Sequence, residues 1–76
     1  MNWLQMPPLS GLRAFAALAE AGNITAAGDS LNVSHAAISQ QLRNLETHLG
    51  ATLLDRSGRA LALTAQGQQL ADALAL

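Results

Sequence analysis

The sequence predicts a small, mainly α-helical domain with a short two-stranded hairpin near its C-terminal end. Apolar residues recur at helical spacing in four segments of the 76-residue chain, whereas a short stretch near residue 60 alternates. Proline, glycine or asparagine residues separate these segments. A chain of this length allows one domain, so the segments are expected to share one small core.

The first helix is predicted to follow the proline pair at residues 7 and 8, which ends any earlier helix and favours an extended entry. Residues 1–8 are therefore interpreted as an N-terminal extension. Ser10 is expected to cap this helix, and Gly22 is expected to end it. Apolar side chains recur between these two positions: Leu12, Phe15, Leu18 and Ala19.

Residues 23–49 are predicted to form a helix-turn-helix. Asn23 or Thr25 is expected to cap a short second helix, which ends in a turn at residues 32–33. Ser34 then caps a longer third helix, and the glycine at position 50 ends it. One face of the third helix carries a stripe of apolar residues, namely Ile38, Leu42, Leu45 and Leu49. The opposite face is free to present polar side chains outward.

The pattern after the third helix indicates a hairpin. Two short runs, residues 52–56 and 59–63, flank Ser57-Gly58. In the second run, Leu61 and Leu63 alternate with alanine, as in a half-buried strand. A two-residue turn that contains glycine between such runs predicts two short antiparallel strands.

A fourth helix is predicted after Thr64, which is placed to cap it. Its leucines at positions 70 and 74 form an apolar stripe that has no evident partner in so short a chain. The order of helix, helix-turn-helix, hairpin and helix is that of a winged helix-turn-helix. Residues 9–63 are assigned to this domain, and residues 64–76 to the start of a further helix.

Charge and cysteine content narrow the classes of function. The formal net charge is −1, with no lysine and four arginines, and DNA-binding domains usually carry a more basic footprint. Three of the four arginines nevertheless follow residue 40. The absence of cysteine excludes a disulfide framework and a thiolate metal site, and fits a cytoplasmic protein. Neither a signal peptide nor a membrane-spanning segment is indicated.

Sequence motifs occur in a fixed order from about Leu9 to Leu70. They are LRAF at residues 12–15, SQQLRNLE at 39–46, the LG helix stop at 49–50 and LTAQG at 63–67. Each motif alone is weakly specific, but together they cover most of the chain. In this pattern the chain resembles the N-terminal DNA-binding domain of LysR-type transcriptional regulators.

The resemblance implies that the chain is part of a bacterial regulator that binds double-stranded operator DNA as a homodimer. Members of this family carry a linker helix and an effector-binding domain after this region. Residues 64–76 would then begin the linker helix, and a small-molecule effector would bind only in the domain that this sequence lacks. Because the linker helix pairs two subunits in the family, Leu70 and Leu74 are expected to begin a dimer surface.

The chain departs from the family pattern at several positions. His35 replaces the usual glutamine at the start of the recognition helix, Ala36 replaces proline or serine, and Gln40 replaces arginine or a similar long side chain. In the second helix, Gly28 replaces alanine, which costs about 1 kcal/mol of helix propensity and permits close approach of the two helices. These departures leave the expected fold unchanged. They also mean that the operator sequence usual for the family cannot be carried over to this chain.

Candidate DNA contacts are selected by the helix pattern together with the resemblance: Thr25, Ser34, His35, Ala36, Ser39, Gln40, Arg43, Arg56 and Arg59. Glutamine and serine can bond to base edges, hydroxyls at helix N-termini suit phosphate, and arginine suits phosphate or the minor groove. All of these candidates except Ala36 also have a structural alternative. The hydroxyls can serve only as caps, the polar residues can form a solvated face or an exposed turn, and Arg43 can pair with Glu46.

Two other functions remain open at this point. A winged helix can bind protein, which the net charge of −1 permits, or a truncated chain can pair with full-length regulators and block them. Catalysis is not expected, because no nucleophile–base arrangement or pair of carboxylates stands out. No cofactor is expected, and a metal site is not indicated because His35 and His48 are far apart in sequence and no cysteine is present.

Overall fold

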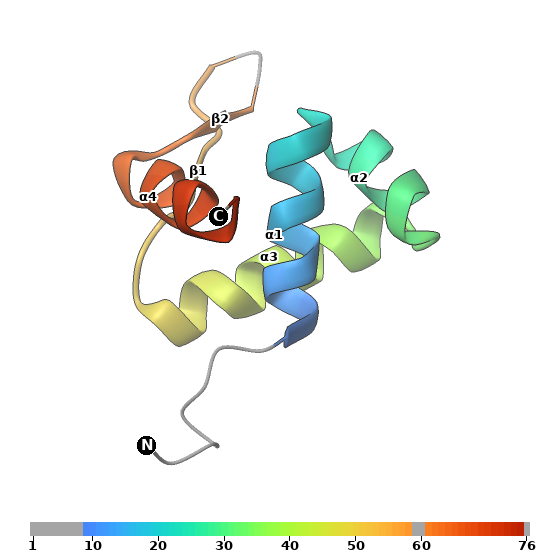
Figure 1. Cartoon of the computed structure of the whole chain (residues 1–76). Coiled ribbons are helices and arrows are strands. Elements are labelled where there is room, and N and C mark those ends of the chain that lie inside the picture. The colour runs from blue at the N-terminus through green and yellow to red at the C-terminus, as the bar shows by residue number, and fades with distance from the viewer. Residues whose placement is uncertain (1–8, 59–60, 76) are drawn as a thin grey trace.

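The computed structural model describes residues 9–58 and 61–75, in which a wing and a fourth helix follow three packed helices (Figure 1). The elements are α1 (Leu9–Ala21), α2 (Ile24–Leu31), α3 (His35–Leu49), β1 (Leu54–Asp55), β2 (Ala62–Leu63) and α4 (Ala65–Leu74). In Figure 1, α2 and α4 lie on opposite sides of α1, and α3 crosses behind α1. The predicted winged helix-turn-helix is confirmed.

The core forms where α1 meets α2 and α3. Phe15 of α1 is 0% exposed and lies among other buried apolar side chains: Ala14, Leu18, Ala27, Ile38, Leu42, Leu45, Leu53 and Leu54. The apolar stripe predicted for α3 is therefore right at its first three positions. Burial does not extend to Leu49, the last residue of α3, which is 40% exposed.

Three of the predicted helix caps are confirmed. The side chains of Asn23, Ser34 and Thr64 accept hydrogen bonds from the backbone N–H groups of Ala26 (2.7 Å), Ala37 (3.1 Å) and Gly67 (3.0 Å). The prediction that Ser10 caps the first helix is wrong, because α1 already includes Leu9. The Ser10 hydroxyl instead donates to Gln41 Oε1 (2.7 Å), which ties the start of α1 to α3.

The turn between α2 and α3 is tight. Asn32 takes the left-handed conformation (φ 59°), and the N–H of Val33 donates to the carbonyl of Gly28 (2.9 Å). A Cβ atom at position 28 would lie only 2.8 Å from the Val33 carbonyl oxygen and 3.7 Å from Ile38 Cγ1. Glycine thus permits a close approach, as expected, but chiefly to the turn backbone and only secondarily to α3.

The wing is a two-stranded antiparallel sheet in which Leu54 pairs with Leu63 and Asp55 with Ala62. A two-residue turn at Ser57-Gly58 would require Asp55 to pair with residue 60, so the predicted two-residue turn is wrong. The register depends on tertiary contacts, since both leucines before the loop, Leu53 and Leu54, are buried. A local sequence pattern does not encode these contacts.

Candidate nucleic-acid interface

The helix α3 separates an apolar side from a polar side. Its apolar side is buried, whereas His35, Ala36 and Gln40 are exposed and Ser39 is half-buried on the outer surface. The carboxamide of Gln40 donates through Nε2 to Asn44 Oδ1 (2.9 Å), one helical turn further on. This bond orients the Gln40 side chain along the exposed face and leaves its Oε1 and one N–H for an outside partner.

A shallow hollow of about 470 Å³ brings together candidates from three elements. Thr25 lies in the first turn of α2, His35 begins α3, and Arg56 follows β1. These three side chains line the hollow together with Gly22, Asn23, Ile24 and Leu61. The two helix N-termini add first-turn backbone N–H groups that have no partner within their helix, of which Asn23 and Ser34 cap one each, and the positive ends of the helix dipoles. This region therefore suits an anionic group such as phosphate.

The alternative partner proposed for Arg43, an ion pair with Glu46, does not form. Arg43 is exposed on α3, and no ion pair of its guanidinium is found within the described part of the chain. Glu46 instead lies 3.9 Å from Arg56 through Oε1 and Nη1, and it accepts two backbone hydrogen bonds from the wing. Glu46 was not selected from the sequence, because its partners lie seven or more residues away and leave no local signal.

The wing loop begins with a local turn at Asp55. Its Oδ1 accepts hydrogen bonds from the Ser57 hydroxyl (2.6 Å) and the Ser57 N–H (2.9 Å). These two bonds lower the pKa of the Asp55 carboxyl from its ordinary value, with the hydroxyl as the larger cause. Arg56 therefore directly follows an ionised carboxylate, that of Asp55, in the chain. Arg59, the other predicted wing contact, lies outside the described residues.

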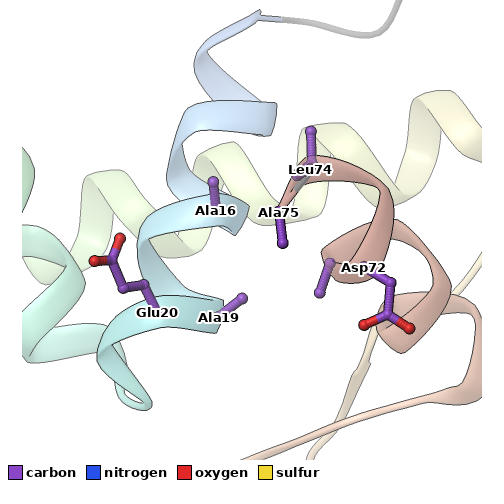
Figure 2. Close-up of a pocket in the computed structure, with 7 residues that line it drawn as sticks. Ala16, Ala19, Glu20, Asp72, Leu74 and Ala75 are labelled. Atoms are coloured by element: carbon purple, nitrogen blue, oxygen red, sulfur yellow. The ribbon is translucent and has the colours of Figure 1, made fainter.

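The two leucines of α4 have different environments. Leu70 is half-buried and packs against the domain's own core, so its predicted place on an unpartnered stripe is only partly right. Leu74 is 40% exposed and borders a hollow of about 420 Å³ between α1 and α4. Figure 2 shows the small side chains of Ala16, Ala19 and Ala75 in this region, with the carboxylates of Glu20 and Asp72 toward its edges.

Other kinds of site find little support in the described residues. In that part of the chain, no three His, Cys, Asp or Glu side chains gather closely enough to hold a metal ion. None of the described helices has the length and apolar character needed to cross a bilayer. The residues selected from the sequence thus gather mainly at the N-terminal face of α3 and at the wing.

A helix-turn-helix with a wing, and with polar candidates on the outer face of its second helix, defines the class of this chain. Residues 9–68 match the family described as bacterial regulatory helix-turn-helix protein, lysR family, and the chain belongs to that family. The AhcY transcriptional activator HvrB of Rhodobacter capsulatus is 52% identical over 75 residues, which are 99% of this chain and 26% of that protein. The chain thus spans about a quarter of the length of this relative.

Solved structures share the fold. The BenM_DBD/catB site 1 DNA complex matches with a TM-score of 0.80 and 35% identity over 87% of this chain and 74% of that chain. Vibrio fischeri DarR in complex with DNA matches with a TM-score of 0.79 and 33% identity over 90% of this chain and 24% of that chain. The chain is therefore a LysR-type helix-turn-helix domain.

Proposed function

We propose that this chain is the operator-reading part of a bacterial transcriptional regulator and that α3 enters the major groove of double-stranded DNA. The observation that carries this proposal is the two-sided character of α3. Its apolar side is anchored by Ile38, Leu42 and Leu45, which are at most 1% exposed, and its outer side is polar. A helix held in this way by a preceding helix is the recognition element of helix-turn-helix proteins.

The candidate residues divide into two roles. Ser39 and Gln40 are proposed to read base edges. His35 is proposed to contact a base edge or a phosphate, and Ala36 lies beside it in the first turn of α3. The remaining candidates are proposed to contact the sugar–phosphate backbone: Thr25, Ser34, Arg43, Arg56 and Arg59. Contacts of the second kind fix the register of the domain on the duplex but carry no sequence information directly.

The relatives that were crystallised with DNA support this function over the two alternatives. A module that binds only protein would not need the exposed cations on α3 and at the wing, and the decoy role has no support from these relatives. The relative HvrB is a transcriptional activator. For this chain we propose only that it belongs to a transcriptional regulator, not that the regulator is an activator. Since bacterial DNA is the proposed partner, we place the chain in the cytoplasm.

We further propose that a second copy of the chain covers the hollow between α1 and α4. Leu74 is exposed there, at the end of the helix that the family resemblance assigns to dimerisation. The alanines on both helices would permit close approach of a partner helix. Leu70 contributes less than expected from the sequence, because it already packs on its own core.

Selection of bound duplexes from a random DNA pool tests the function and the pairing together. We expect the parent chain to enrich an interrupted inverted repeat, because the symmetry of a dimer imposes symmetry on its half-sites. A Leu74→Asp variant, which places a charge in the proposed interface, should enrich single half-sites. Recovery of the starting pool by the parent would contradict DNA reading, and inverted repeats recovered by the variant would contradict the proposed interface.

A further inference from the structure

The carboxylate of Glu46 joins the recognition helix to the wing. Its Oε2 accepts hydrogen bonds from the backbone N–H groups of Leu53 (2.8 Å) and Leu54 (3.3 Å). Its Oε1 lies 3.9 Å from Arg56 Nη1, and the Glu46 side chain is only 15% exposed. Hydrogen bonds from backbone amides to an ionised carboxylate are among the stronger ones, so this contact fixes the start of the wing.

The position of this backbone decides where Arg56 lies. Leu54 begins β1 and is locked to Leu63 of β2, and Arg56 follows directly after β1. Arg56 lines the hollow that also contains Thr25 and His35 from the two helix N-termini. Glu46 therefore sets the spacing between the wing cation and the start of the recognition helix.

The ion pair itself is the smaller part of this arrangement. Its atoms are 3.9 Å apart and the Arg56 side chain is 47% exposed, a geometry that contributes little in water. The guanidinium can leave Glu46 for a phosphate while the carboxylate stays bonded to the two amides. The main action of Glu46 is thus on the backbone of the wing.

We propose that Glu46 is a positioning residue for DNA binding, which acts by holding the wing so that Arg56 meets the DNA backbone. This inference rests on the proposed function. It runs against simple charge reasoning, because removal of an acidic side chain near DNA should by itself strengthen binding. A positioning role predicts the opposite sign.

The test uses the 76-residue chain and a fluorescent duplex that the parent chain enriches from a random pool. Affinity is measured by anisotropy over a series of salt concentrations. Arg56→Ala should weaken binding about tenfold, as expected for a lost charged hydrogen bond, and should reduce the salt slope by about 0.9 per subunit. Glu46→Ala and Glu46→Asp should reproduce both changes, because alanine lacks the carboxylate and aspartate is too short to reach the amides.

Three further variants separate positioning from charge and from folding. Glu46→Gln keeps an oxygen that can accept from the amides, so it should bind within about twofold of the parent. Glu46→Ala added to Arg56→Ala should cause no further loss, because coupled residues are not additive. Asp29→Ala removes one exposed negative charge from α2 and should not weaken binding. Circular dichroism checks each fold, and Glu46→Asp carries the comparison if Glu46→Ala unfolds.

The outcomes distinguish a failure of the proposed DNA binding from a failure of the positioning role of Glu46. If the parent enriches no duplex, DNA binding fails and the role of Glu46 fails with it. If Arg56→Ala changes neither affinity nor salt slope, the wing contact is wrong and Glu46 positions nothing. If Arg56→Ala weakens binding but Glu46→Asp keeps the parent affinity, or the double variant loses more than Arg56→Ala, only the positioning role is overturned.

Discussion

Replacement of Phe15 by alanine is expected to lower the free energy of unfolding by about 3–5 kcal/mol. Phe15 is 0% exposed at the junction of α1 with the buried face of α3, so the truncation leaves a cavity as well as losing apolar contacts. A domain of this size has a total stability of about 4–11 kcal/mol, so the loss is a large share. Urea denaturation followed by circular dichroism measures it.

Leu9→Ala is the matched control for Phe15→Ala. Leu9 lies on the same helix but is 72% exposed, so its truncation should change stability by at most about 0.5 kcal/mol. A Phe15→Ala variant that unfolds at the same urea concentration as Leu9→Ala would contradict the assigned core.

Gly67→Ala is the second large effect that we expect. Gly67 is buried in the first turn of α4, and an added Cβ would run into the Leu53 carbonyl oxygen and lie 3.1 Å from its carbonyl carbon. Alanine gains about 1 kcal/mol of helix propensity, but the backbone must shift to accept it. We expect a net destabilisation of about 2 kcal/mol, which lowers the melting temperature by roughly 8–16 °C.

The neighbouring change Gln68→Ala provides the control for Gly67→Ala. Gln68 is exposed one position further along α4, and within the described residues its side chain donates a hydrogen bond only to Asp72 Oδ1 (2.9 Å). We expect almost no change in melting temperature for this variant. A Gly67→Ala variant that melts with or above the parent would show that α4 does not pack so closely on Leu53.

Local signals in the sequence predicted the helices well. Apolar spacing located the stripe from Ile38 to Leu45, and the cap residues Asn23, Ser34 and Thr64 marked three helix starts correctly. These features depend on residues within one or two helical turns of each other. The order of elements could therefore be predicted from the sequence, and the spacing of the motifs allowed the family to be predicted as well.

Features that depend on tertiary packing were not readable in the same way. The wing register depends on burial of Leu53 and Leu54 and on Thr64, whose hydroxyl donates to the Thr52 carbonyl (2.5 Å) and whose N–H donates to Leu53 (3.0 Å). The hydrogen bond that Glu46 accepts from Leu53 likewise joins α3 to the segment that leads into the wing. Because such contacts join separate elements, the periodic pattern of the sequence does not predict them.

The central claim is that the outer face of α3 reads base edges, and a base-by-base scan of the enriched duplex tests it most directly. Each base pair is changed in turn, and affinity is measured for the parent, for Gln40→Ala and for Gln68→Ala. Both glutamines donate to a side chain four residues ahead at 2.9 Å, so the two variants remove similar helix-surface bonds. We predict that the parent loses about 1–3 kcal/mol at a base pair read by Gln40. Gln40→Ala alone should bind the two duplexes that differ at this pair equally. The claim would be contradicted if Gln40→Ala discriminated between base pairs as well as the parent at every position. It would also be contradicted if no base change altered the affinity of the parent.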